Sequence, residues 1–131
     1  MNLLPWWCEL DIRIVHPDLD PEKLTRELAV SPSIAQKPGE SKIHFQNCKS
    51  AGYWCVVHRV EHPARPDSAI LWAERFVQDR ETQIRRMLQD GFAITSYLGV
   101  HANVMTVGFD MPSTPLLRSL GIPLGIEFYS R

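Results

Sequence analysis

The chain has 131 residues, of which 44% are hydrophobic and 22% charged, and its formal net charge is −1. This length and composition indicate one folded domain over residues 1–131 and exclude a disordered chain. The balanced charge lacks the lysine and arginine excess of a general nucleic-acid binder, and no apolar run is long enough to cross a bilayer, so we expect neither nucleic acid nor a membrane as a partner.

The cysteines and the first residues favour a cytoplasmic location. Cys8, Cys48 and Cys55 are an odd number of cysteines with no paired spacing, which is typical of reduced thiols. The opening stretch MNLLPWWCEL has neither the basic region nor the long apolar region of a secretory signal. We therefore expect a cytoplasmic protein.

The first expected element is a strand over residues 6–15, with the sequence WWCELDIRIV. Apolar residues at positions 10, 12 and 14 alternate with charged residues at positions 9, 11 and 13. Such alternation is typical of a strand with one buried face and one open face.

A short helix is expected next, and its pattern recurs near the end of the chain. In LDPEKLTRELAVSP (19–32), Asp20 is a good N-cap and Pro21 suits the first helical position. STPLLRSLGIP (113–123) repeats this order, with Ser113 or Thr114 as cap and Pro115 in the first turn. Both helices are too short to be stable alone, so we expect the leucine pairs at 24 and 28, and at 116 and 120, to dock them on a sheet.

The middle of the chain predicts a loop, a strand and a long helix. Residues 33–51 are mostly loop with one short candidate strand at 43–45, and YWCVVHRV (53–60) is rich in β-formers, with Trp54 as a core anchor. A helix capped by Asp67 or Ser68 extends to about Asp90, and it could kink or split at the polar stretch QDRETQ. Its expected apolar stripe is Ile70, Ala73, Phe76, Val77, Ile84, Met87 and Leu88.

The last part of the chain predicts three more strands. FAITSYLGV and NVMTVGF read as two strands of a hairpin joined by HAN, which places His101 in a turn. After the third helix, LGIEFY forms the last strand, with residues 124, 126 and 128 facing inward. The expected fold is an α+β single-domain sandwich, an antiparallel or mixed sheet of five or six strands with three helices, in the order β-α-(β)-β-α-β-β-α-β.

Three stretches together resemble a known family: LDPEKLTRELAVSPSIAQKPGE, GYWCVV and GVHANVMTVGFDMPSTPLLRSLGIPLGIEFY. They combine a strand, a proline-started helix, a tryptophan that opens a strand, a leucine-rich helix and a strand that closes in an aromatic residue. This order is similar to that of the uncharacterised family called domain of unknown function 4279. The resemblance implies a small bacterial-type α+β domain and assigns no catalytic residues.

The best metal candidates are Cys55, His58 and His62 in CVVHRVEH. Zinc needs such ligands to converge tetrahedrally, but residues 55 and 58 of a strand point to opposite faces. We therefore expect no metal and no cofactor. Cys8 and Cys55 lie in apolar β-rich runs, which favours buried thiols over a nucleophile, and there is no GxSxG, P-loop, GxGxxG or HExxH motif. No catalytic residue is assigned.

The open face of the expected sheet is the candidate binding surface. If the helices cover one face, the other carries a mixture of polar, charged and aromatic side chains. This is either an ordinary solvated face or a surface that binds a protein or a small ligand; an RNA-binding sheet would need basic residues in place of the acidic ones. Its members are Glu9, Asp11, Arg13, Thr95, Tyr97, Glu127 and Tyr129.

Trp6 and Trp7 form a candidate interface. Two adjacent strand residues cannot both face the core, so one indole needs a cover from elsewhere in the chain or from another chain. Exposed aromatic residues mark interfaces, which makes a homodimer or an unknown protein partner at this strand edge a hypothesis.

The sequence favours a non-enzymatic protein-interaction or ligand-binding module, with an immunity-type accessory protein as one form of it. The alternative is a small enzyme or metal-dependent hydrolase that uses His58 and His62.

Overall fold

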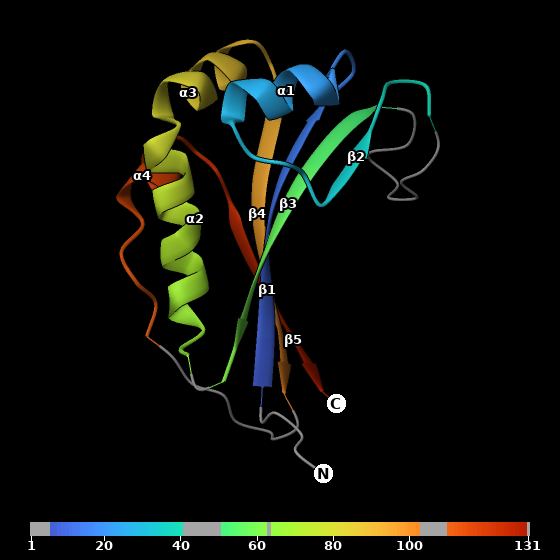
Figure 1. The fold of residues 1–131 in the computed structure, drawn as a ribbon. Helices are drawn as coiled ribbons and strands as arrows, with labels where there is room; N and C mark the ends of the chain where they lie inside the picture. The colour runs from blue at the N-terminus through green and yellow to red at the C-terminus, as the bar shows by residue number, and fades with distance from the viewer. Residues whose placement is uncertain (1–5, 41–50, 63, 103–109, 131) are drawn as a thin grey trace. The chain divides into compact units, whose positions relative to one another are not determined.

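The computed structural model describes residues 6–40, 51–62, 64–102 and 110–130. The candidate strands at 43–45 and 103–109 lie outside these residues. The elements in chain order are β1 (Trp6–His16), α1 (Pro21–Leu28), β2 (Ile34–Gln36), β3 (Gly52–Glu61), α2 (Asp67–Asp79), α3 (Glu81–Gln89), β4 (Ala93–Ala102), α4 (Pro115–Ser119) and β5 (Leu124–Ser130) (Figure 1).

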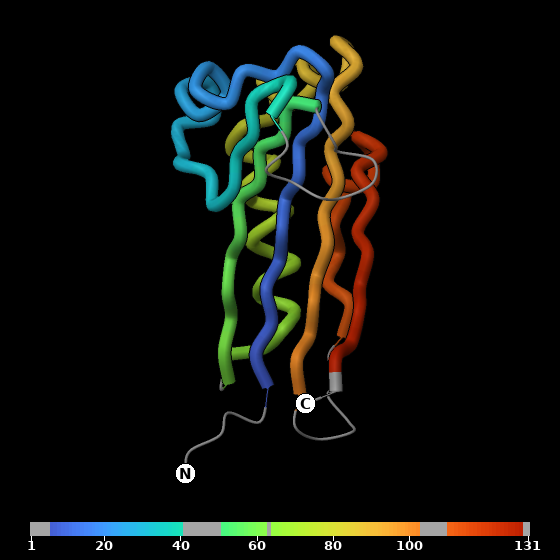
Figure 2. The backbone as a smooth tube through the Cα atoms, turned by 90° about the vertical axis from the view of Figure 1, so that its right-hand side faces the viewer, coloured from blue at the N-terminus to red at the C-terminus, as the bar shows by residue number. Residues whose placement is uncertain are grey.

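The strands form one mixed sheet in the order β2-β3-β1-β4-β5. β2 runs antiparallel to β3, whereas β5 runs parallel to β4, with Ser96 opposite Leu124 and Ala102 opposite Ser130. Figure 2 shows β4 and β5 side by side. The predicted α+β class with a mixed five-stranded sheet is confirmed. β1 is the central strand, because it lies between β3 and β4.

The chain divides into two compact units. The first unit contains Met1–Asp11, His58–Asp79 and Ser96–Arg131, and the second contains Ile12–Val57 and Arg80–Thr95. Strands β1, β3 and β4 each contribute one part to either unit. The prediction of a single domain therefore stays a prediction.

The core of the first unit is built by the inward residues of the strands and the apolar stripe of α2. Cys8, Leu10 and Leu98 are fully buried, as are Ile70 and Val77 of α2. α2 contacts α4, and the Glu74 carboxylate accepts hydrogen bonds from the backbone N–H groups of residues 116 and 117, at 2.6 and 3.0 Å. Glu74 thereby supplies acceptors for the first turn of α4.

The second unit carries the helix that the sequence predicted best. The side chain of Asp20 accepts the N–H of Glu22 at 3.1 Å, and Pro21 occupies the first turn of α1. Leucines 24 and 28 of this helix are buried, as expected. Trp54 is fully buried, and its indole N–H donates to the hydroxyl of Thr25 at 3.1 Å, which confirms it as a core anchor.

The long helix is split at Arg80 into α2 and α3, within the stretch QDRETQ where the sequence allowed a kink or a split. Other local predictions were wrong. Leu88 is only half-buried, whereas Met87 faces the core. In α4 the buried leucine is Leu117 rather than those at 116 and 120, and no side chain of Ser113 or Thr114 caps the helix. Phe128 is 59% exposed instead of inward, because β5 is the last strand of the sheet.

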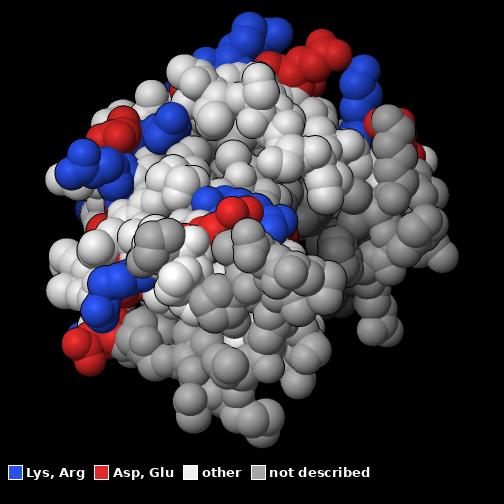
Figure 3. All heavy atoms as spheres, turned by 60° about the horizontal axis from the view of Figure 1, so that its bottom comes forward, with Lys and Arg blue, Asp and Glu red and all other residues white. Residues whose placement is uncertain are grey.

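The charged surface agrees with the balanced composition. On the side shown in Figure 3, the described lysine and arginine side chains lie close to aspartate and glutamate side chains. No helix in the described part of the chain is both long and apolar enough to cross a membrane.

Candidate functional site

Five of the seven predicted open-face residues belong to the first unit. β1 carries Glu9 and Asp11, β4 carries Tyr97, and β5 carries Glu127 and Tyr129. In β1 the odd-numbered residues are half-buried and alternate with buried even-numbered ones, as the sequence pattern predicted. The other two, half-buried Arg13 and exposed Thr95, belong to the second unit.

Four planar side chains from four successive strands stack across this face. Trp7 of β1 and His101 of β4 have ring centroids 3.9 Å apart and planes only 6° from parallel. His101 in turn stacks on Tyr129 of β5, with centroids 4.7 Å apart at 15°. On the other side of Trp7, the guanidinium carbon of Arg59 lies 4.0 Å from its ring centroid. We call Arg59, Trp7, His101 and Tyr129 the aromatic ladder.

The stacking determines whether the faces or the edges of the rings are open to solvent. The rings come from neighbouring strands and are within 15° of parallel, so they stack along the direction from strand to strand. The inner rings therefore stand on the sheet with their faces against one another and their edges outward. A platform that stacks nucleic-acid bases needs open ring faces, so this arrangement suits contacts at ring edges instead.

At the end of the ladder, two tyrosine hydroxyl groups bind the carboxylate of Glu127. The hydroxyls of Tyr97 and Tyr129 both donate to the Glu127 carboxylate, the latter at 2.9 Å, and the two hydroxyl oxygens lie 3.4 Å apart. A Cβ added at Gly125 would lie 2.9 Å from the Tyr97 ring, and one added at Gly99 would lie 3.3 Å from the Tyr129 ring. The tyrosines thus lie over glycines, which leave room for their rings.

The charges beside the ladder are mainly negative. Arg59 pairs with Glu61 at 2.8 Å and with Glu9 at 3.9 Å, so one guanidinium is shared between two carboxylates. The carboxylates of Asp11 and Glu127 belong to the same side of the sheet, by strand parity. We call the ladder and these polar neighbours the acidic ladder face: Trp7, Glu9, Asp11, Arg59, Glu61, Tyr97, His101, Glu127 and Tyr129.

The residues of the metal hypothesis have other contacts. His58 stacks on Trp72 with centroids 4.6 Å apart at 4°, and His62 meets the ring of Trp6 edge-on at 6.1 Å. Burial lowers the pKa of His58. Within the described residues, no group of three histidine, cysteine or acidic side chains is placed to hold a metal ion. The hydrolase alternative stays a prediction.

The cysteines of the described chain are buried thiols. Cys8 is fully buried, and burial together with the neighbouring charge of Glu9 raises its pKa to about 11. Cys55 is 1% exposed. Burial keeps both thiols from solvent, and the raised pKa of Cys8 makes that thiol a poor nucleophile.

The tryptophan pair has covers within its own chain. Trp6 faces the core with 9% exposure, whereas Trp7 is half-buried between Arg59 and His101. The interface hypothesis assumed that these indoles lie at an edge of the sheet. They do not, because β1 is the central strand.

Sequence reasoning missed two members of the ladder. His101 was expected in a hairpin turn, but β4 extends through Ala102 and gives His101 the same parity as Tyr97. Arg59 lies in a strand that the sequence did predict, and its position between His58 and Val60 was the available signal for the open face.

Comparison with family models, with curated proteins and with solved structures finds no match. The resemblance to the domain of unknown function 4279 family stays a prediction, and the function has to be argued from the site.

Proposed function

We propose that this chain is a non-enzymatic protein-interaction module that binds a basic segment of a partner protein on the acidic ladder face. The single observation behind the proposal is the aromatic ladder, a row of stacked side chains that lies, among the described residues of the first unit, beside four carboxylates and contains one guanidinium, that of Arg59. Lysine and arginine side chains are the natural complement of such a surface.

The ladder would lower the cost of binding. Trp7 and His101 are already held face to face, and Tyr129 is held by both His101 and Glu127, so little side-chain freedom remains to be lost. Aromatic and arginine residues are also those enriched at interface centres. The carboxylates would repel phosphate groups, which supports a protein rather than a nucleic acid as the partner.

An immunity-type accessory role is one form of this function. In that role the acidic ladder face would cover a basic surface of a partner enzyme, and charge complementarity would speed the encounter.

The test is a titration with a short lysine- and arginine-rich peptide, followed by calorimetry, beside a peptide in which glutamate replaces each basic residue. We expect only the basic peptide to bind, with an affinity that falls as salt rises. The double variant Glu9→Gln/Glu127→Gln should bind at least about tenfold more weakly, the loss expected for one or two charge-assisted contacts.

The matched control is Glu22→Gln/Glu81→Gln, which removes the same charge from α1 and α3. It should bind the basic peptide like the parent chain. Equal weakening by both double variants would mean that net charge alone attracts the peptide, and it would refute the proposed surface. So would no binding of the basic peptide at low salt.

A further inference from the structure

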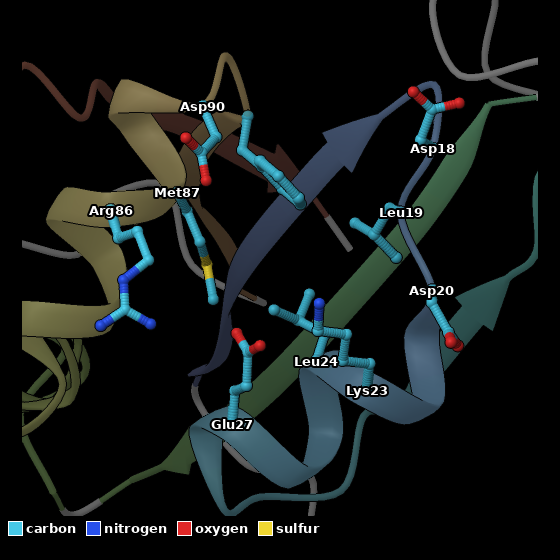
Figure 4. Close-up of a pocket in the computed structure, with 10 residues that line it drawn as sticks. Asp18, Leu19, Asp20, Lys23, Leu24, Glu27, Arg86, Met87 and Asp90 are labelled. Carbon is cyan, nitrogen blue, oxygen red and sulfur yellow. The ribbon is translucent and has the colours of Figure 1, made fainter.

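The second unit contains a pocket of about 370 Å³ between α1 and α3 (Figure 4). Its apolar part is formed by Leu19, Leu24 and Met87, which are at most 4% exposed, and by half-buried Phe92. The ring of Phe92 is held by His16, with centroids 4.2 Å apart at 18°. The volume lies within the range of small-molecule sites.

The two helices that form the pocket are tied to each other. The guanidinium of Arg80, at the start of α3, donates to the backbone carbonyl of Leu28, at the end of α1, at 2.8 Å. α1 is also tied to β3, because the Trp54 indole donates to Thr25. The walls of the pocket are therefore preformed rather than assembled by a ligand.

The rim carries exposed charged side chains of both signs. Lys23 and Glu27 are one turn apart on α1, and Arg86 and Asp90 are one turn apart at the end of α3. In both pairs the basic residue precedes the acidic one, which is the less favourable order for a pair one turn apart on a helix. Glu81 and Arg85 of α3, in the favourable order, do pair, at 2.7 Å. Within the described residues, the side chains of the four rim residues form no ion pair or hydrogen bond, and Figure 4 shows them around the pocket.

We propose that this pocket binds a small zwitterion with an apolar side chain, of the type of a free aliphatic amino acid. A carboxylate would meet Lys23 and Arg86, an ammonium group would meet Glu27 and Asp90, and the side chain would lie on the apolar floor. A ligand with a single charge would satisfy one pair and leave the other with only solvent. Asp18 and Asp20 also line the pocket and add negative charge to it, so an amine is the closest competitor.

The experiment uses the full chain and four probes of graded chemistry. L-leucine carries all three features; 4-methylpentanoate lacks the ammonium group, 3-methylbutylamine lacks the carboxylate, and glycine lacks the apolar side chain. Binding is followed by chemical-shift changes of Met87 and Phe92 and by calorimetry. We expect L-leucine to bind in the millimolar range or more tightly, and each truncated probe to bind at least about tenfold more weakly.

Variants locate the site. Arg86→Gln and Glu27→Gln should each weaken L-leucine binding by about tenfold. Arg85→Gln is the matched control, because it removes the same charge from the neighbouring position of α3 but does not line the pocket. Its binding should equal that of the parent chain.

Two results would overturn the proposal. One is no shift of Met87 or Phe92 at saturating millimolar L-leucine. The other is equal binding of L-leucine and 3-methylbutylamine, which would mean that the acidic groups attract any amine. Neither result would bear on the function proposed for the acidic ladder face, because the pocket residues belong to the second unit and the ladder residues to the first.

Discussion

Glu74 is a half-buried acid whose role is local and structural. The N-cap of α4, Thr114, makes no side-chain hydrogen bond to the helix, so the first N–H groups need another acceptor. The Glu74 carboxylate accepts two of them at 2.6 and 3.0 Å. One side chain of α2 therefore replaces the cap that the sequence led us to expect from Ser113 or Thr114.

Glu74→Gln tests this role. The amide keeps one acceptor oxygen but loses the charge, and we expect the free energy of unfolding to fall by about 1–3 kcal/mol. Urea denaturation measures it. The control Glu81→Gln removes an exposed partner of Arg85 and should cost no more than about 0.5 kcal/mol. Equal stability of Glu74→Gln and the parent chain would show that the contact contributes nothing.

His58 makes stability depend on pH. Its pKa is lowered by burial, so below the ordinary value of 6.5 the unfolded chain binds a proton that the folded chain does not. Its contribution to stability is therefore complete above that pH and is lost as the pH falls towards the lowered pKa. Melting temperatures between about pH 7.5 and about pH 5.5 should fall more in the parent chain than in His58→Phe, which keeps a ring against Trp72. The same fall in both chains would exclude His58 as the cause.

At the scale of elements, the break at Arg80 determines which apolar residues of the two helices are buried. The apolar stripe predicted over one long helix is shared between α2 and α3, which begin and end separately. In α3 the buried residues are Ile84 and Met87, so Leu88 lies beside the buried row rather than within it. The helical periodicity therefore predicted most of the buried residues correctly, but it wrongly included Leu88 at the end of the stripe.

Alanine substitutions should reproduce this difference. Phe76→Ala removes a side chain that is 5% exposed and should cost about 3–5 kcal/mol, and Ile84→Ala should cost about 2–5 kcal/mol. Leu88→Ala should cost less than half of the Ile84→Ala value, because its side chain is only half-buried. Chemical denaturation of the three variants checks this order. A Leu88→Ala cost as large as that of Ile84→Ala would contradict it.

For the whole molecule, what could be predicted from sequence depended on whether the signal was local. The alternation in β1 and the Asp20–Pro21 start of α1 lie within a few residues, and both predictions are confirmed. Strand parity alone also placed Tyr97, Glu127 and Tyr129 on the open face.

The aromatic ladder could not be predicted in this way. It depends on strand order and register, which bring residues 7, 59, 101 and 129 side by side from four strands. No single stretch of the sequence contains a signal for strand order or for register. The parallel pairing of β5 with β4 was equally hidden, because it is fixed by packing rather than by a turn.

The intrachain covers of Trp7 lead to a prediction about association. We expect Trp7→Ser to lower the free energy of unfolding by about 2 kcal/mol, through lost ring contacts, and to leave the molecular mass from light scattering unchanged. Trp7→Phe, which retains a ring between Arg59 and His101, is the control and should lose less stability. If the parent chain is a dimer and Trp7→Ser a monomer of equal stability, the indole belongs to an interface after all.

The parallel pairing of β4 and β5 also has a consequence for the order of folding. β5 can meet β4 only after the chain has returned along the length of the strand, so the entropy of closing that connection is lost before any contact between the strands is gained. We infer that β5 joins the sheet late and opens early. The pairing of Glu127 with Tyr97 waits for this step, so the acidic ladder face would be completed only as folding ends.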